Sequence, residues 1–207
     1  INKVFPGVIA LSDVDFRLFK GEVHAVMGQN GAGKSTLVKV LTGVYQQESG
    51  DVSLEGKKIN PGSTLEAQKL GINTVYQEIN LCLNLTVAEN MFIGKEPMKH
   101  GIIDWKEMNR KAEEVLSRLN INIDVTRNLS SYSIALQQMV AIARVLDSSA
   151  KILILDEPTA GVDIELRRSM WNFLSDLNQN GTTIILTTNY LEEAEQLCQT
   201  IAIINHG

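Results

Sequence analysis

The nine residues Gly28–Thr36 constrain the fold of this chain more than any other segment. They read Gly-Gln-Asn-Gly-Ala-Gly-Lys-Ser-Thr and directly follow an apolar run, Val23–Met27. This spacing satisfies the pattern Gly-x4-Gly-Lys-Ser/Thr between a buried strand and a helix that begins near Thr36. Glycines allow successive backbone N–H groups to turn inward, and the helix N-terminus adds its positive end. The segment therefore predicts a loop that wraps the phosphates of a nucleotide.

Two side chains of this loop are expected to have different roles in binding the nucleotide. Lys34 would reach the β and γ phosphates as a point charge, and the hydroxyl of Ser35 would bind Mg²⁺. The other residues expected to line the phosphates are Gly28, Asn30, Gly31, Ala32, Gly33 and Thr36.

A second apolar run, Ile152–Leu155, ends in two carboxylates and a proline. A buried strand that emerges at the carboxyl edge of a parallel sheet would present such carboxylates to the phosphates. We expect Asp156 to hold the metal, usually through water, and Glu157 to orient or deprotonate the attacking water. Pro158 then turns the chain away from the strand.

Short, continuously apolar runs recur along the chain, as is typical of parallel strands covered on both faces. Segments with helical spacing separate them, which indicates an α/β sheet. Leu11–Leu18 and Asp51–Glu55 alternate instead, and together with a turn at Phe19–Glu22 they predict an antiparallel hairpin beside the main sheet. The apolar runs are Val23–Met27, Asn73–Tyr76, Ile152–Leu155, Thr183–Leu186 and Ile201–Ile204.

Helix signals replace strand-like runs between Gly94 and Ala150. Asp104 followed by Glu107 has the spacing of a capping box, and Asp163 is a candidate N-cap for a later helix. We therefore expect one domain, with an α/β core and its β flank over residues 1–93 and 151–207. The expected helical subdomain covers residues 94–150.

Composition excludes several classes of protein. The 207 residues are 44% hydrophobic, so the chain can bury a core, and the net charge of −5 disfavours nucleic acid as the main partner. Cys82 and Cys198 share no disulfide or zinc-site spacing, which fits a reducing compartment. No apolar run approaches the length of a membrane span. The chain begins at Ile1 and stops at Gly207 within structured sequence, so we expect a domain trimmed at both ends.

In their order, these motifs resemble the ATP-binding subunits of ABC transporters, with a P-loop ATPase core, and the resemblance covers nearly the whole chain. It implies that Gln77 contacts Mg²⁺ and the attacking water. It also implies that Ser133 donates to the γ phosphate held by a partner domain and that Asp163 lies in a loop contacting that partner. Phe5 matches the aromatic residue that stacks on adenine, although an ordinary core phenylalanine is an alternative.

The signature segment that begins at Tyr132 lacks both glycines and the glutamine of the family's LSGGQ pattern. Such loosened signatures resemble the importers of ribose, galactose and galactofuranose. This resemblance implies ATP and Mg²⁺ as ligands and a second nucleotide-binding domain, in a homodimer or in tandem. Further implied partners are a transmembrane permease and, indirectly, a periplasmic solute-binding protein. The implied location is peripheral, on the cytoplasmic face of the inner membrane.

Two features depart from that branch. The tail after Pro158 resembles exporter-type ATPases, and Asn189 stands where the family has its switch histidine. An asparagine amide donates a hydrogen bond but cannot exchange a proton near neutral pH. The hypothesis is therefore a motor domain that hydrolyses ATP slowly. Two alternatives are a soluble ABC ATPase that acts on ribosomes and a nucleotide-binding module with little turnover.

Overall fold

The structure, a computed structural model, describes residues 1–76, 81–146 and 150–205. The chain forms two compact units. The first consists of Ile1–Gln77, Ser148–Pro158 and Leu174–Gly207, and the second of Glu78–Asp147 and Thr159–Phe173. Within the described residues, no helix combines the length and the apolarity that crossing a bilayer requires.

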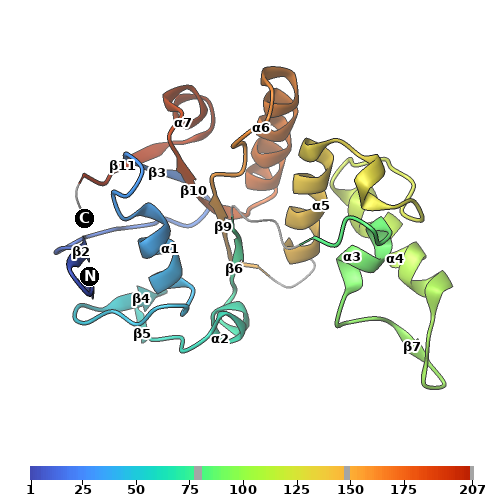
Figure 1. Cartoon of the computed structure of the whole chain (residues 1–207), viewed down its shortest axis with the longest axis horizontal. Coiled ribbons are helices and arrows are strands. Elements are labelled where there is room, and N and C mark those ends of the chain that lie inside the picture. Colours follow the sequence, from blue (N-terminus) through green and yellow to red (C-terminus); the bar gives the residue numbers. More distant parts are fainter. Residues whose placement is uncertain (77–80, 147–149, 206–207) are drawn as a thin grey trace. The chain divides into compact units, whose positions relative to one another are not determined.

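A parallel sheet of five strands organises the first unit (Figure 1). Its spatial order is β11 (Thr200–Ile203), β3 (Val23–Met27), β10 (Thr183–Thr188), β9 (Ile152–Asp156) and β6 (Ile72–Val75). The register places Thr187 beside both Asp156 and Val26. This confirms the α/β fold predicted from the apolar runs.

Helices cover this sheet, which is why its strands are apolar on both faces. Leu37 and Val38 of α1 (Lys34–Leu41) and Ala67 of α2 (Thr64–Lys69) form one core cluster with the strand residues Ile154 and Ile185. Residues that alternate with these on the strands, such as Leu153 and Leu155, are equally buried. The unit also contains α7 (Leu191–Leu197) and the last turns of α6 (Ile164–Gln179).

The antiparallel part differs from the prediction. One hairpin pairs β1 (Lys3–Phe5) with β2 (Val8–Leu11), and another pairs β4 (Val52–Leu54) with β5 (Lys57–Ile59). Residues 12–19, all of them described, form no strand, so the strand expected over Leu11–Leu18 was wrong beyond Leu11, the last residue of β2. The expected turn at Phe19–Glu22 does form, with the Glu22 N–H donating to the Phe19 carbonyl oxygen at 3.3 Å, but it leads from this extended segment into β3 and does not close a hairpin. Val14, Phe16 and Leu18 still pack against the core. The alternation of apolar and polar residues therefore indicated an extended segment with one buried side, and such a segment need not pair with another strand.

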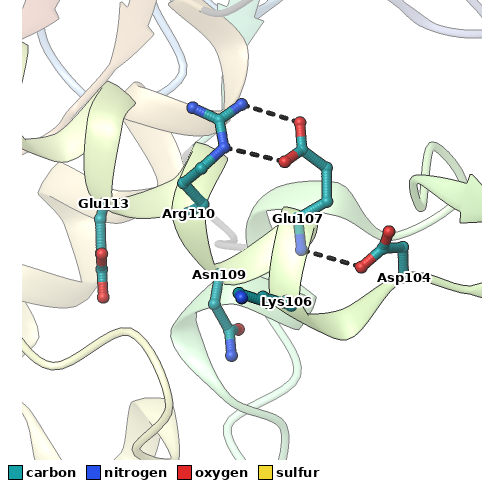
Figure 2. A pocket seen from close by; sticks show the side chains of 6 residues that line it. All are labelled: Asp104, Lys106, Glu107, Asn109, Arg110 and Glu113. Atoms are coloured by element: carbon teal, nitrogen blue, oxygen red, sulfur yellow. Dashed lines mark hydrogen bonds and ion pairs between the residues drawn. The ribbon is translucent and has the colours of Figure 1, made fainter.

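The second unit is mainly helical. It contains α3 (Val87–Phe92), α4 (Trp105–Arg118), a 3-10 turn η1 (Leu129–Ser131), α5 (Ile134–Leu146) and the first turns of α6. A short hairpin of β7 (Met98–Lys99) and β8 (Ile102–Ile103) precedes α4. The Asp104 carboxylate accepts from the Glu107 backbone N–H at 3.0 Å, which is one half of the expected capping box (Figure 2). The other half does not form, because the Asp104 N–H donates to the Pro97 carbonyl oxygen and the Glu107 carboxylate accepts from Arg110.

Polar side chains of α4 line a surface pocket of about 430 Å³ (Figure 2). Arg110 donates two hydrogen bonds to the Glu107 carboxylate, at 2.8 and 2.7 Å, and a third to Glu114 at 3.1 Å. These pairs are exposed and three or four residues apart on one helix, so they support the helix by only a few tenths of a kcal/mol each.

Candidate nucleotide-binding site

The loop between β3 and α1 is shaped by close backbone approaches. Gly33 has a φ of 107°, and a Cβ there would lie 2.5 Å from the Ala10 carbonyl oxygen. A Cβ at Gly28 would lie 2.4 Å from the carbonyl oxygen of Ile204. Any side chain at these positions would clash with the backbone of β2 or with that of Ile204, the residue after β11. Gly28 and Gly33 are thus required because no side chain fits at either position. Between them the chain bends toward the start of α1.

Lys34 is buried and surrounded by oxygen atoms. Its ammonium donates to the carbonyl oxygens of Gly28 at 2.8 Å and Gln29 at 3.3 Å, and to Oδ1 of Asn189 at 2.7 Å. Oε1 of Glu157 lies 3.7 Å from the same nitrogen. A buried ammonium needs such acceptors because desolvation would otherwise disfavour its charge. The same group can exchange these partners for phosphate oxygens.

Ser35 and Asp156, both expected to hold the metal, lie within hydrogen-bond distance of each other. The hydroxyl of Ser35 donates to Oδ1 of Asp156 at 3.3 Å. A hydroxyl next to a carboxylate is a set of hard oxygen donors, which suits Mg²⁺ when phosphate oxygens and water complete its shell. Within the described residues, no group of three His, Cys, Asp or Glu side chains forms a metal site. Ser35 and Asp156 supply two oxygen donors, a set that fits an ion held jointly with a phosphate ligand.

Glu157 follows β9 in an unusual backbone conformation. Its φ is 49°, in the left-handed region that non-glycine residues rarely adopt. Its N–H donates to both the hydroxyl and the carbonyl oxygen of Thr187, at 3.0 and 3.1 Å. These bonds hold the turn after the strand, which leaves the Glu157 carboxylate near Lys34.

Asn189 uses its whole amide group in the site. Oδ1 accepts from Lys34, and Nδ2 donates to Oδ1 of Asn30 at 2.8 Å and to Oε1 of Glu157 at 3.1 Å. The amide orientation follows from this network, because a lysine can only donate and a carboxylate can accept. The residue at the switch position therefore bridges the phosphate loop and the carboxylate that follows β9.

A cavity of about 450 Å³ opens over the loop. Phe5, Val8 and Ala10 of the β1–β2 hairpin supply apolar lining, and Lys34 and Glu157 supply charge. Phe5 makes an edge contact with Tyr45, with ring centroids 5.1 Å apart. Phe5 therefore lines the cavity, as its expected role requires. Its stacking on adenine stays a prediction. The remaining lining residues are Asn30, Gly31, Gly33, Ser35 and Thr36.

Tyr76 ties the end of β6 to the far end of α1. Its hydroxyl lies 2.8 Å from the hydroxyl of Thr42, the C-cap residue of α1. Burial raises the pKa of the Tyr76 phenol, and the Asp156 carboxylate raises it further, against the lowering effect of the Thr42 bond. Tyr76 thus stays neutral across the physiological range, next to the position of Gln77.

Three further residues were predicted for the site. Gln77 lies outside the described residues. Ser133 and Asp163 belong to the second unit, where each caps a helix. Oγ of Ser133 accepts from the N–H of Leu136 at 3.4 Å, and Oδ1 of Asp163 accepts from Leu166 at 2.9 Å. The N-cap predicted at Asp163 is confirmed, whereas the roles of both residues toward a partner domain stay predictions.

One contact residue was missed from the sequence. The hydroxyl of Thr187 donates to Oδ1 of Asp156 at 2.5 Å and is buried. Neither spacing nor motif singled it out. The signal that could have found it is the position of Thr187 at the carboxyl end of a strand adjacent to β9, where its side chain can reach Asp156.

A parallel sheet with a glycine-rich loop, a buried lysine and two carboxylates at one edge defines a P-loop nucleotide-binding domain. The family model described as ABC transporter matches residues 11–160. The chain therefore belongs to the ABC transporter family.

Among curated relatives, the chain is 46% identical to the galactofuranose transporter ATP-binding protein YtfR of Escherichia coli. This match covers all of the chain and 41% of the relative. It is 41% identical to a ribose import ATP-binding protein of Rubrobacter xylanophilus, covering 100% of the chain and 42% of the relative. The chain thus spans about two fifths of the length of these relatives.

Two solved structures are similar over nearly the whole chain. One is a nucleotide-free ATP-binding cassette from an ABC transporter, with a TM-score of 0.88 and 28% identity, covering 100% of this chain and 86% of that one. The other is the dimeric, post-hydrolysis state of the cassette MJ0796 bound to ADP and Pi. Its TM-score is 0.78 at 27% identity, with 97% and 88% covered.

Proposed function

We propose that this chain is the ATP-binding and ATP-hydrolysing motor domain of an ABC transporter that imports a monosaccharide. The observation that carries the proposal is the cavity over the phosphate loop, which Lys34, Ser35 and Glu157 line. Asn189 bonds Lys34 and Glu157, and Asp156 bonds Ser35, so both join this set through hydrogen bonds. Relatives named for galactofuranose, ribose, fructose and xylose support a sugar as the solute.

The phosphate loop binds the triphosphate. Backbone N–H groups between Gly28 and Ser35 and the N-terminus of α1 face the phosphates, and Lys34 exchanges its present oxygen acceptors for phosphate oxygens. Phe5 packs against the base. Because the whole chain carries a net charge of −5, attraction of the anionic nucleotide depends on these local groups.

Ser35 and Asp156 hold Mg²⁺, with Gln77 as a further predicted ligand. When bound there, Mg²⁺ would supply positive charge against the charge that develops on the phosphate oxygens. Glu157 orients a water molecule and accepts its proton, and Asn189 fixes the Glu157 carboxylate through its Nδ2 donor. The asparagine amide cannot exchange a proton, so turnover is slower than with an imidazole at this position.

Two such domains, in a homodimer or in tandem, enclose the nucleotides, with Ser133 and Asp163 of each facing the other. The dimeric MJ0796 cassette supports such an arrangement. A transmembrane permease couples this closure to transport at the cytoplasmic face of the membrane. A periplasmic solute-binding protein delivers the sugar to that permease.

The substitution Glu157→Gln tests the hydrolytic role. We expect phosphate release to fall at least 100-fold, because the amide cannot accept a proton, while ATP binding is retained. Release of phosphate and equilibrium binding of ATP are measured on the same preparation. If phosphate release by the unsubstituted chain is already at the level of E157Q, the second candidate holds. That candidate is a nucleotide-binding module with little turnover, which Asn189 favours.

A further inference from the structure

The two carboxylates at the end of β9 have different tasks and need different surroundings. Asp156 must keep a carboxylate oxygen on the metal side, next to Ser35, whereas Glu157 must face the attacking water. The backbone between them turns sharply, because Glu157 has a φ of 49°. A conformation of this kind costs on the order of 1 kcal/mol and persists only where neighbouring groups hold it.

The hydroxyl of Thr187 contacts both sides of this turn. It donates its one proton to Oδ1 of Asp156 at 2.5 Å and accepts from the backbone N–H of Glu157 at 3.0 Å. The direction of both bonds is fixed, because the amide can only donate and a carboxylate accepts. The side chain is fully buried, so water does not compete for these bonds. Thr187 and Asp156 are direct neighbours in the parallel register of β10 and β9.

We propose that Thr187 is a positioning residue for the hydrolytic site. Its hydroxyl holds the Asp156 carboxylate in the orientation that receives Mg²⁺ and holds Glu157 in its left-handed turn. The inference rests on the proposed roles of Asp156 and Glu157. Thr187 itself contacts neither nucleotide nor water in this scheme and acts through the two carboxylates.

Other threonines of β10 make different contacts. The hydroxyl of Thr183, at the opposite end of the strand, accepts from the N–H of Gly21 at 2.9 Å, and that of Thr188 accepts from Tyr190 at 3.0 Å. Both hydroxyls bond backbone groups of connecting segments. Thr183 is buried like Thr187 but lies at the edge away from the carboxylates, which makes it a matched control.

The substitution Thr187→Val separates the hydroxyl from the side-chain volume. Valine keeps the branched shape, and the bond from the Glu157 N–H to the carbonyl oxygen of residue 187 remains, so the strand itself is preserved. Oδ1 of Asp156 loses one hydrogen-bond donor, so the Asp156 carboxylate can rotate more freely. Thr187→Ser restores the hydroxyl with one methyl group less, and Thr183→Val removes a buried hydroxyl far from the site.

Turnover and metal dependence are measured for T187V, T187S and T183V in the full 207-residue chain. For T187V we expect kcat to fall about tenfold, with KM for ATP changed less than threefold, because loss of a group that orients a metal ligand typically lowers activity 10- to 100-fold.

A second readout is independent of turnover. The Mg²⁺ concentration at which ATP gives half of its thermal stabilisation should rise about tenfold in T187V, and ATP binding in EDTA should be unchanged. T187S and T183V should stay within threefold of the unsubstituted chain in every readout.

The proposal is overturned if T187V matches T183V in kcat and Mg²⁺ requirement, or if T187S is as defective as T187V. The latter pattern would show that packing matters and the hydroxyl does not. Glu157→Gln is measured alongside these variants. If E157Q keeps full turnover, the proposed function fails; if E157Q is inactive and T187V is normal, only the role of Thr187 fails.

Discussion

Asn189 shows how one residue can join groups that lie far apart in the sequence. Its amide contacts Lys34, Asn30 and Glu157 at the same time, accepting at one end and donating at the other. A neutral imidazole has one donor and one acceptor, so it could keep two of these contacts and would release the third. The asparagine thus holds the lysine and the carboxylate together more completely, at the cost of any proton exchange.

Asn189→His should raise turnover. We expect kcat to increase about tenfold or more, since an imidazole can share a proton with the reacting groups and the asparagine cannot. The activity of N189H should also fall below about pH 6.5 as the imidazole becomes charged beside Lys34, whereas the unsubstituted chain should show no such change there. Steady-state phosphate release from pH 5.5 to 8.5 checks both expectations. Equal rates for the two proteins would contradict them.

At the scale of single elements, the second unit depends on a buried polar contact at α3. The side chain of Asn90 accepts from the Cys82 N–H at 2.8 Å and donates to the carbonyl oxygens of Cys82 and Thr86, both at 2.9 Å. It is fully buried. These bonds satisfy the backbone of the segment before the helix, while the capping box of Thr86 and Glu89 satisfies the helix start. One side chain therefore determines how the chain enters α3.

Asn90→Ala should destabilise the protein by about 1–3 kcal/mol, because it removes the hydrogen bonds of a buried side chain and leaves the Cys82 N–H without its acceptor. The carbonyl oxygens of Cys82 and Thr86 keep the N–H groups of Leu85 and residue 90 as donors. The matched control is Asn109→Ala on α4 (Figure 2), where alanine is the better helix former and stability should change by less than about 0.5 kcal/mol. Urea denaturation of the three proteins gives these differences. A loss of stability in N90A no larger than that of N109A would contradict the assigned role.

The sequence predicted those parts of the site whose contacts are local. Gly28, Gly33 and Lys34 lie within one loop, so their spacing alone specifies the geometry. The position of Asp156 and Glu157 could be predicted because they directly follow an apolar run that forms a buried strand. Thr187 was missed because its contact with Asp156 depends on the register between β9 and β10, which no local pattern encodes. The strand wrongly predicted over Leu11–Leu18 has a related cause. Alternation of apolar and polar residues indicates which side chains are buried, whereas strand pairing also depends on a partner that can be distant in the sequence.

At the scale of the whole molecule, the first unit combines three separate stretches of chain, and the candidate site draws residues from each of them. Lys34, Asp156 and Asn189 come from different stretches, so a ligand that contacts all three holds the unit together. Binding to the folded state alone raises the free energy of unfolding by mass action.

MgATP should therefore stabilise the chain. At 100 times its Kd we expect a gain of about 2.7 kcal/mol, and a melting temperature about 5–10 °C higher for a chain of this size. Lys34→Ala should abolish most of the shift. Lys58→Ala, which removes an exposed lysine of β5, should keep it. Differential scanning calorimetry with and without MgATP checks this expectation, and a full shift in K34A would exclude the assigned phosphate contact.

The strand order has a consequence for synthesis of the chain. β3, which leads into the phosphate loop, is paired only with β10 and β11 within the described sheet, and β10 begins about 160 residues later. At 5–20 residues per second, a ribosome needs roughly 10–30 s to supply the first partner of β3. During that interval the nascent β3 has exposed edges and an apolar face, as strands with distant partners do. We therefore expect nucleotide binding to appear abruptly and late in translation, and this strand to be the natural target of a chaperone that holds the unfinished chain.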